Sequence, residues 1–136
     1  MDWVRLLGRR LRSLHLSGGP VSPELLNAIT QLGELRVFGI DDAPVSGEMV
    51  GMIVRLDKLE SLSLQNAGTT DDDVAQIAKF TKLRSLLLSK SKVTDKGLSS
   101  LKSLTGLTML DVRGLSLSPQ ALADFEAAVP KCKVFK

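Results

Sequence analysis

The stretch LRSLLLSKSKVTDKGLSSLKSLTG, residues 83–106, changes its apolar period partway along. Leu86 and Leu88 are two residues apart, which is the spacing of a strand with one buried face. Leu98, Leu101 and Leu104 are three residues apart, which is typical of a short helix with one apolar stripe. The stretch therefore predicts a short strand, a turn and a helical return within 24 residues.

The same pattern recurs along the chain with a period of 24 residues. Leucines at 11, 35, 59, 83 and 107 open five consecutive blocks. The fourth and sixth positions of the blocks are apolar throughout: Leu14, Phe38, Leu62, Leu86 and Leu110, then Leu16, Ile40, Leu64, Leu88 and Val112. Each such side chain contributes about 1.5–3 kcal/mol when buried, but only a neighbouring block can bury it. The blocks are expected to stack, with their strands in one parallel sheet.

These motifs resemble the leucine-rich repeat family. Its L-x-x-L-x-L pattern matches LRSLHL (11–16), LESLSL (59–64) and LRSLLL (83–88). The segment VTDKGLSSLKSL (93–104) resembles the T-D-x-G-L variant of bacterial repeat proteins and of F-box ubiquitin-ligase adaptors. The resemblance implies an α/β solenoid, with a parallel sheet on the concave face and short helical returns on the convex face.

One position departs from the family. The family usually carries asparagine at the ninth position of the repeat, where this chain has Gly19, Ala43, Ala67, Ser91 and Leu115. An asparagine ladder cannot form from these residues. The backbone groups of these loops must therefore bond to water or to one another.

The chain divides into three parts by this pattern. Residues 1–10 are expected to form a partial N-terminal helical cap, residues 11–130 the five repeats, and residues 131–136 a truncated terminal strand. The last block slips by one residue, because four residues separate Phe125 from Val129 where earlier blocks have three. We expect Cys132 and Phe135, rather than Lys131 and Val134, at the first and fourth positions of the last strand, with Cys132 a buried spacer.

An acidic run, TTDDD at residues 69–73, raises the possibility of a calcium site. The twelfth position of every block, however, is a hydroxyl residue: Ser22, Ser46, Thr70, Thr94 and Ser118. A hydroxyl just before an amphipathic helix is typical of an N-cap, and acidic residues favour the first helical turn. Asp73 then completes a capping box with Thr70. Capping is the favoured interpretation, and calcium remains the alternative.

Composition narrows the functional classes. The 136 residues are 43% hydrophobic and 24% charged, with a net charge of +3, a pI of about 9.2 and 4% aromatic residues. A single cysteine excludes an intrachain disulfide, and no apolar run reaches the ~18 residues of a membrane span. His15 is the one histidine, and no phosphate-binding loop or catalytic constellation is evident. We expect a cytoplasmic protein that is not an enzyme, with no cofactor, no metal and no small-molecule substrate.

The solvent face of the sheet is the expected binding surface, and we expect it to be too shallow for a small substrate. Arginines recur at the second position of the blocks, and a guanidinium can bind a carboxylate through two hydrogen bonds. The candidate partner-binding residues are Arg12, His15, Arg36, Asp41, Asp42, Glu60, Gln65, Arg84, Lys90, Asp111 and Arg113.

These residues favour a module that binds a protein partner across the sheet face. One alternative is a substrate-recognition part of a larger assembly, such as a ubiquitin-ligase adaptor. The other is nucleic-acid binding through Arg5, Arg9, Arg10 and Arg12, which would be salt-dependent.

The capping interpretation makes a thermodynamic prediction. Replacing Thr70 by alanine should lower the free energy of unfolding by ~1 kcal/mol, because a helix N-terminus loses its cap. Urea unfolding measures this change. A chelator should leave the melting temperature unchanged, whereas a chelator-sensitive melt would reinstate the calcium site.

Overall fold

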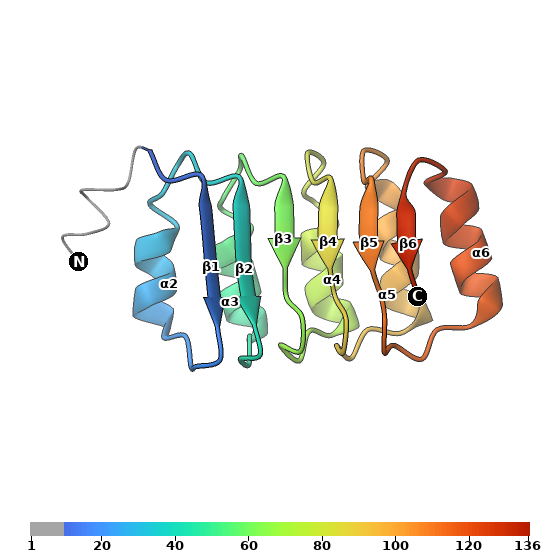
Figure 1. Ribbon diagram of the computed structural model, residues 1–136, viewed down its shortest axis with the longest axis horizontal. Coiled ribbons are helices and arrows are strands. Elements are labelled where there is room, and N and C mark those ends of the chain that lie inside the picture. The colour runs from blue at the N-terminus through green and yellow to red at the C-terminus, as the bar shows by residue number, and fades with distance from the viewer. Residues whose placement is uncertain (1–9) are drawn as a thin grey trace.

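Residues 10–136 are described by a computed structural model, in which six strands form one parallel sheet whose order follows the chain (Figure 1). The strands are β1 (Ser13–Ser17), β2 (Val37–Asp41), β3 (Ser61–Ser63), β4 (Ser85–Leu87), β5 (Met109–Asp111) and β6 (Lys133–Phe135). The predicted helical cap lies, apart from Arg10, outside the described residues.

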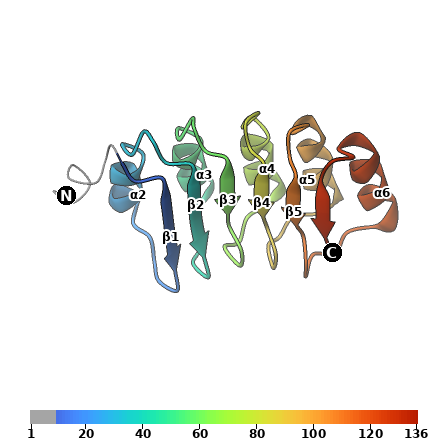
Figure 2. The same ribbon diagram turned by 45° about the horizontal axis from the view of Figure 1, so that its top comes forward.

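A helical return follows each of the first five strands. These are α2 (Pro23–Ile29), α3 (Gly47–Ile53), α4 (Asp71–Ile77), α5 (Asp95–Ser100) continued by the 3₁₀ turn η1 (Leu101–Ser103), and α6 (Pro119–Ala128). Figures 1 and 2 show the helices as a row on one side of the sheet, with the other face of the sheet open. The predicted α/β solenoid architecture is confirmed.

Strand pairing keeps the 24-residue period. Leu14 pairs with Phe38, and Leu62 pairs with Leu86. A parallel ladder fixes which face each side chain points to, because successive residues alternate between faces. Equal positions of successive repeats therefore form continuous rows across the sheet.

The apolar rows form one continuous core between sheet and helices. Leu64 and Leu88 of the sixth position are fully buried, as are Ile53 and Ile77 on the helices. Leu14 of β1 is only partly buried, because β1 has a described strand on one side alone. Burial of each repeat thus depends on its neighbours, as expected for a stacked array.

The predicted slip of the last block is confirmed for Cys132 at the first position but is wrong for Phe135 at the fourth. The Cys132 amide donates to the Val129 carbonyl at 3.1 Å, as the Leu107 amide does to Leu104 at 3.0 Å, so Cys132 takes the first position. Yet Val134, not Phe135, pairs with Leu110. The ladder to β5 imposes the 24-residue register, so the extra residue is absorbed before Lys133.

This register determines how far the side chains of Cys132, Val134 and Phe135 are buried. Val134 packs against the core, and Cys132 is half-buried rather than buried. Phe135 moves to the open face, where the Lys133 ammonium lies 5.1 Å from its ring centroid.

The chain leaves each of the first five strands through a left-handed corner at the eighth position. The φ values are 75° at Gly18, 55° at Asp42, 51° at Asn66, 57° at Lys90 and 81° at Gly114. The corner amides bond across repeats, for example Asn66 to the Ser89 carbonyl at 2.9 Å. Further along, the Val45 amide donates to the Ala67 carbonyl at 2.9 Å. Backbone groups here bond to one another, as the missing asparagines require.

The three serines of the hydroxyl row cap their helices as predicted, whereas the hydroxyls of Thr70 and Thr94 donate to carboxylates instead. Ser22, Ser46 and Ser118 accept hydrogen bonds from amides in the first turns of their own helices at 3.1–3.2 Å. Thr94 instead donates its amide and its hydroxyl to Asp71 of the preceding repeat. Asp71 also accepts the Gly97 amide at 3.1 Å, so a carboxylate of α4 caps α5.

The acidic run is therefore a set of backbone caps. Buried Asp73 accepts the Thr70 amide at 2.9 Å and the Thr70 hydroxyl at 3.0 Å, within the predicted capping box. Partial burial raises the pKa of Asp71, but hydrogen bonds from Thr94 and Gly97 outweigh it and hold the pKa below its usual value. In residues 10–136 no group of three or more histidine, cysteine or acidic side chains is arranged to hold a metal ion.

A substitution at Gly97 tests the contact that Asp71 makes between α4 and α5. A Cβ at Gly97 would overlap the Asp71 Oδ1 atom and lie 2.8 Å from Val93 Cγ1. Gly97→Ala should therefore lower the free energy of unfolding by about 1–3 kcal/mol, because the carboxylate must leave its place. Urea unfolding measures the change.

Gly51→Ala is the matched control in α3, since its Cβ would make an ordinary contact 3.4 Å from Gln76 Oε1. This variant should stabilise by about 0.5–1 kcal/mol, because alanine has the higher helix propensity. An equal gain from both substitutions would contradict the role of Gly97.

Candidate functional site

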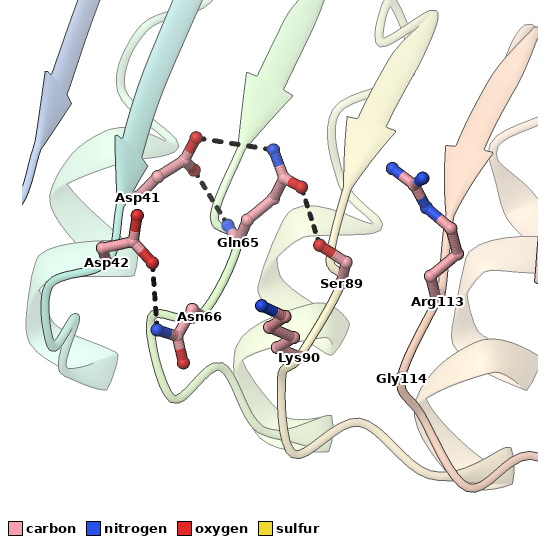
Figure 3. Close-up of a pocket in the computed structure, with 8 residues that line it drawn as sticks. All are labelled: Asp41, Asp42, Gln65, Asn66, Ser89, Lys90, Arg113 and Gly114. Carbon is pink, nitrogen blue, oxygen red and sulfur yellow. Dashed lines mark hydrogen bonds between the residues drawn. The ribbon is translucent and has the colours of Figure 1, made fainter.

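A hydrogen-bonded polar ladder crosses the C-terminal ends of the strands on the open face (Figure 3). It consists of the seventh-position residues Asp41, Gln65 and Ser89. Asp41 Oδ1 accepts the Gln65 amide at 2.9 Å and the Ser63 hydroxyl at 2.7 Å. Gln65 Oε1 accepts the Ser89 hydroxyl at 2.7 Å. The ladder joins three adjacent repeats and is held rigid by these bonds.

His15 adds the first repeat to the ladder. Its Nε2 lies 3.0 Å from Asp41 Oδ2. The imidazole fits because Gly39 has no side chain, since a Cβ there would stand only 2.7 Å from His15 Cε1. The sequence placed His15 on the open face but missed its bond to Asp41. Such a bond joins positions five and seven of neighbouring repeats, which lie on the same face.

Asp111 and Arg113 form an ion pair at the other end of the ladder. Arg113 donates to the nearly buried Asp111 from Nε at 3.0 Å and from Nη2 at 2.7 Å. These bonds from Arg113 lower the pKa of Asp111, although burial opposes them, and the pKa of Arg113 is raised in turn. The Arg113 side chain stays 62% exposed, so it remains accessible to a ligand.

A groove of about 440 Å³ opens at the ends of β2 to β5, below the polar ladder. It is lined by Asp41, Asp42, Gln65, Asn66, Ser89, Lys90, Arg113 and Gly114 (Figure 3). Acidic side chains stand at the β2 end, whereas basic side chains stand at the β4 and β5 end. The expectation of a uniformly shallow face is therefore wrong at this edge.

The predicted site residues fall into two separate groups, apart from His15 and Asp111, which lie at the two ends of the polar ladder. Asp41, Asp42, Gln65, Lys90 and Arg113 meet in the groove. Three further lining residues, Asn66, Ser89 and Gly114, were missed, although they occupy the same seventh and eighth positions. That shared position is the signal that could have identified them.

The second-position arginines, Arg12, Arg36 and Arg84, form an arginine column at the opposite, N-terminal ends of the strands. The column and the polar ladder are five residues apart along each repeat, or about 16 Å in extended chain. Arg36 pairs with Glu60 at 3.3 Å, and Arg84 makes no ion pair within the described chain. Between column and ladder, Val37 and Met109 expose 43% and 39% of their surface.

Catalytic side chains do not converge in the part of the chain described. His15 on β1 and Cys132, which precedes β6, stand at opposite edges of the sheet. Burial raises the pKa of Cys132 to about 11, so the thiol is protonated at neutral pH. None of the helices in residues 10–136 has the length and apolar content to cross a membrane.

No family model and no curated protein matches the chain. Solved structures do match. An internalin, InlF, from Listeria monocytogenes superposes with a TM-score of 0.63 at 15% identity, over 92% of this chain and 41% of that one. The tropomodulin C-terminal domain of Caenorhabditis elegans gives 0.73 at 11% identity, over 96% and 89%. A leucine-rich repeat protein of Leptospira interrogans gives 0.56 at 16% identity, over 93% and 37%.

The strand–helix units and their common register define a parallel solenoid, and these neighbours share it. The chain has the fold of leucine-rich repeat proteins, as the sequence motifs predicted. It spans less than half the length of the internalin and of the Leptospira protein.

The Asp111–Arg113 pair predicts a pH dependence of stability. Asp111 has a lowered pKa in the folded chain, so it stabilises the fold above the unfolded value of about 3.9, and this contribution is lost as the pH falls through the folded value. Asp111→Asn should melt below the wild type at pH 7.

The difference in melting temperature should shrink between about pH 5 and pH 2, as the wild-type carboxylate takes up its proton. Glu126→Gln is the control, since Glu126 pairs with Lys136 in an exposed ion pair that contributes little. A difference that stays constant with pH would show that the Asp111 charge does not stabilise the fold.

Proposed function

We propose that the chain binds a protein partner across the open face of the sheet and performs no catalysis. The observation that carries the proposal is the exposure of Val37 and Met109, two large apolar side chains that both stand on this face. Arg36 precedes Val37, and Arg84 precedes Ser85, the residue of β4 that pairs with Met109.

This combination is the chemistry of a protein interface. Methionine and arginine are enriched at interfaces, where an apolar centre is surrounded by a polar rim. Arg84 has a guanidinium free of ion pairs within residues 10–136, so it can bind a partner carboxylate through two hydrogen bonds. The serines of β3 and β4 are small, which permits close approach of a partner between the larger side chains.

Nucleic-acid binding is the weaker candidate for this face. Glu60, Asp41 and Asp111 are interleaved with its basic residues and oppose a polyanion. Of the four arginines first considered for nucleic acid, Arg5 and Arg9 lie outside the described residues. A role within a larger assembly is compatible with the proposal, because such an assembly would use the same surface.

Charge reversal at the arginine column tests the proposal. Arg36→Glu combined with Arg84→Glu should abolish capture of the partner, because both interface guanidinium groups become carboxylates. The measurement is affinity capture from the source cells with quantitative mass spectrometry, followed by titration calorimetry with the purified partner.

Lys79→Glu combined with Lys102→Glu is the matched control. It makes the same change of charge on the helical side of the solenoid, where Lys79 follows α4 and Lys102 lies in η1. Melting temperatures of both double variants check the fold. Capture that survives reversal of the two arginines would remove the open face as the binding surface.

A further inference from the structure

We infer that the groove at the ends of β2 to β5 holds an extended segment of the protein partner. The basic side chain of this segment lies at the Asp42 end, and its acidic side chain lies at the Lys90 and Arg113 end. The inference rests on the proposed function and assigns the chemistry of the segment that is bound.

The polar groups of the groove fall into two sets. The Asp41 carboxylate is satisfied within the fold, because Oδ1 accepts two hydrogen bonds and Oδ2 faces His15 and Gln65. The rim is different. Asp42 accepts one side-chain hydrogen bond, from Asn66 Nδ2 at 3.0 Å, and the Lys90 ammonium has no ion pair in residues 10–136. The rigid ladder thus forms the floor, and the rim carries charges that a ligand can reach.

Lys90 has a conformation that is unusual for its residue type. It occupies the left-handed corner with φ of 57°, where the other repeats have glycine, aspartate or asparagine. A long side chain in this conformation is disfavoured, and such strained residues concentrate at binding sites. The Lys90 side chain is exposed and forms no hydrogen bond within the described residues. The fold therefore does not use this ammonium, which leaves it available to a ligand.

The distance between the Asp42 and Lys90 corners indicates which class of ligand fits the groove. Asp42 and Lys90 end strands that are two apart, so their corners are separated by about 10 Å. An extended peptide advances about 3.3–3.6 Å per residue, and three residues therefore span this separation. A free amino acid carries both of its backbone charges on one carbon and cannot reach both ends. A phosphate backbone would meet Asp41 and Asp42, which repel it.

Three blocked hexapeptides of identical composition serve as probes. Acetyl-GKSSEG-amide places its charges three residues apart, and acetyl-GKESSG-amide places them side by side. The reversed order, acetyl-GESSKG-amide, covers the opposite chain direction. Nitrogen-15 NMR titration of the whole chain should show that one of the spaced peptides binds at millimolar concentration. The amide shifts should be confined to the corners at Asp42, Asn66, Lys90 and Gly114.

Three substitutions locate the interaction. Lys90→Gly and Asp42→Asn should each weaken binding of the spaced peptide about tenfold, because each removes one charge-assisted contact. Lys90→Gly should also melt at or above the wild-type temperature, because glycine relieves the left-handed corner. Lys92→Ala removes an exposed lysine outside the groove and should leave binding unchanged.

The outcomes separate this inference from the proposed function. Equal binding of spaced and adjacent peptides, no binding of either spaced peptide, or binding unaffected by Lys90→Gly and Asp42→Asn would overturn the groove assignment. Partner capture that is lost on reversal of Arg36 and Arg84 but unchanged in both groove variants would also overturn it, with the proposed function intact. Capture that survives the arginine reversal would overturn the proposed function.

Discussion

The 24-residue parallel ladder is the constraint on which the rest of the structure depends. Because each strand pairs in register with the next, a position in one repeat always lies beside the same position in its neighbours. A row of leucines therefore becomes a core, a row of hydroxyls becomes a set of helix caps, and a row of short polar residues becomes the polar ladder. The pairing of the strands also overrides side-chain preference. At the last strand it places Val134 rather than Phe135 over the core.

Periodic residues made the fold predictable from the sequence. The strands, the helical returns and the caps at Ser22, Ser46 and Ser118 each depend on a local pattern that recurs five times. The groove was only half predictable. Membership of a row identifies Asp41, Gln65 and Arg113 as neighbours, but the hollow beneath them depends on how each corner turns and on which side chains are already bonded. Neither property has a signature in a single repeat.

The three aspartates of the acidic run show why adjacency along the chain misleads in a repeat protein. They suggest a cation site when considered together, yet each belongs to a different row. Asp73 caps its own helix, Asp71 caps the next one, and Asp72 is exposed to solvent. The role of each carboxylate depends on the residues that face it in the next repeat, as at Gly97, whose missing side chain leaves room for Asp71.

The carboxylates of Asp71 and Asp95 also couple neighbouring repeats, and this coupling is not uniform along the array. Asp71 joins the third repeat to the fourth, and Asp95 joins the fourth to the fifth through the Ser118 amide at 2.9 Å. The first two repeats have Pro23 and Gly47 at this position and cannot make the bridge. In a one-dimensional array, stability is a sum of repeat terms and nearest-neighbour couplings. The bridges therefore couple the third, fourth and fifth repeats through a contact that the first two repeats cannot make at this position.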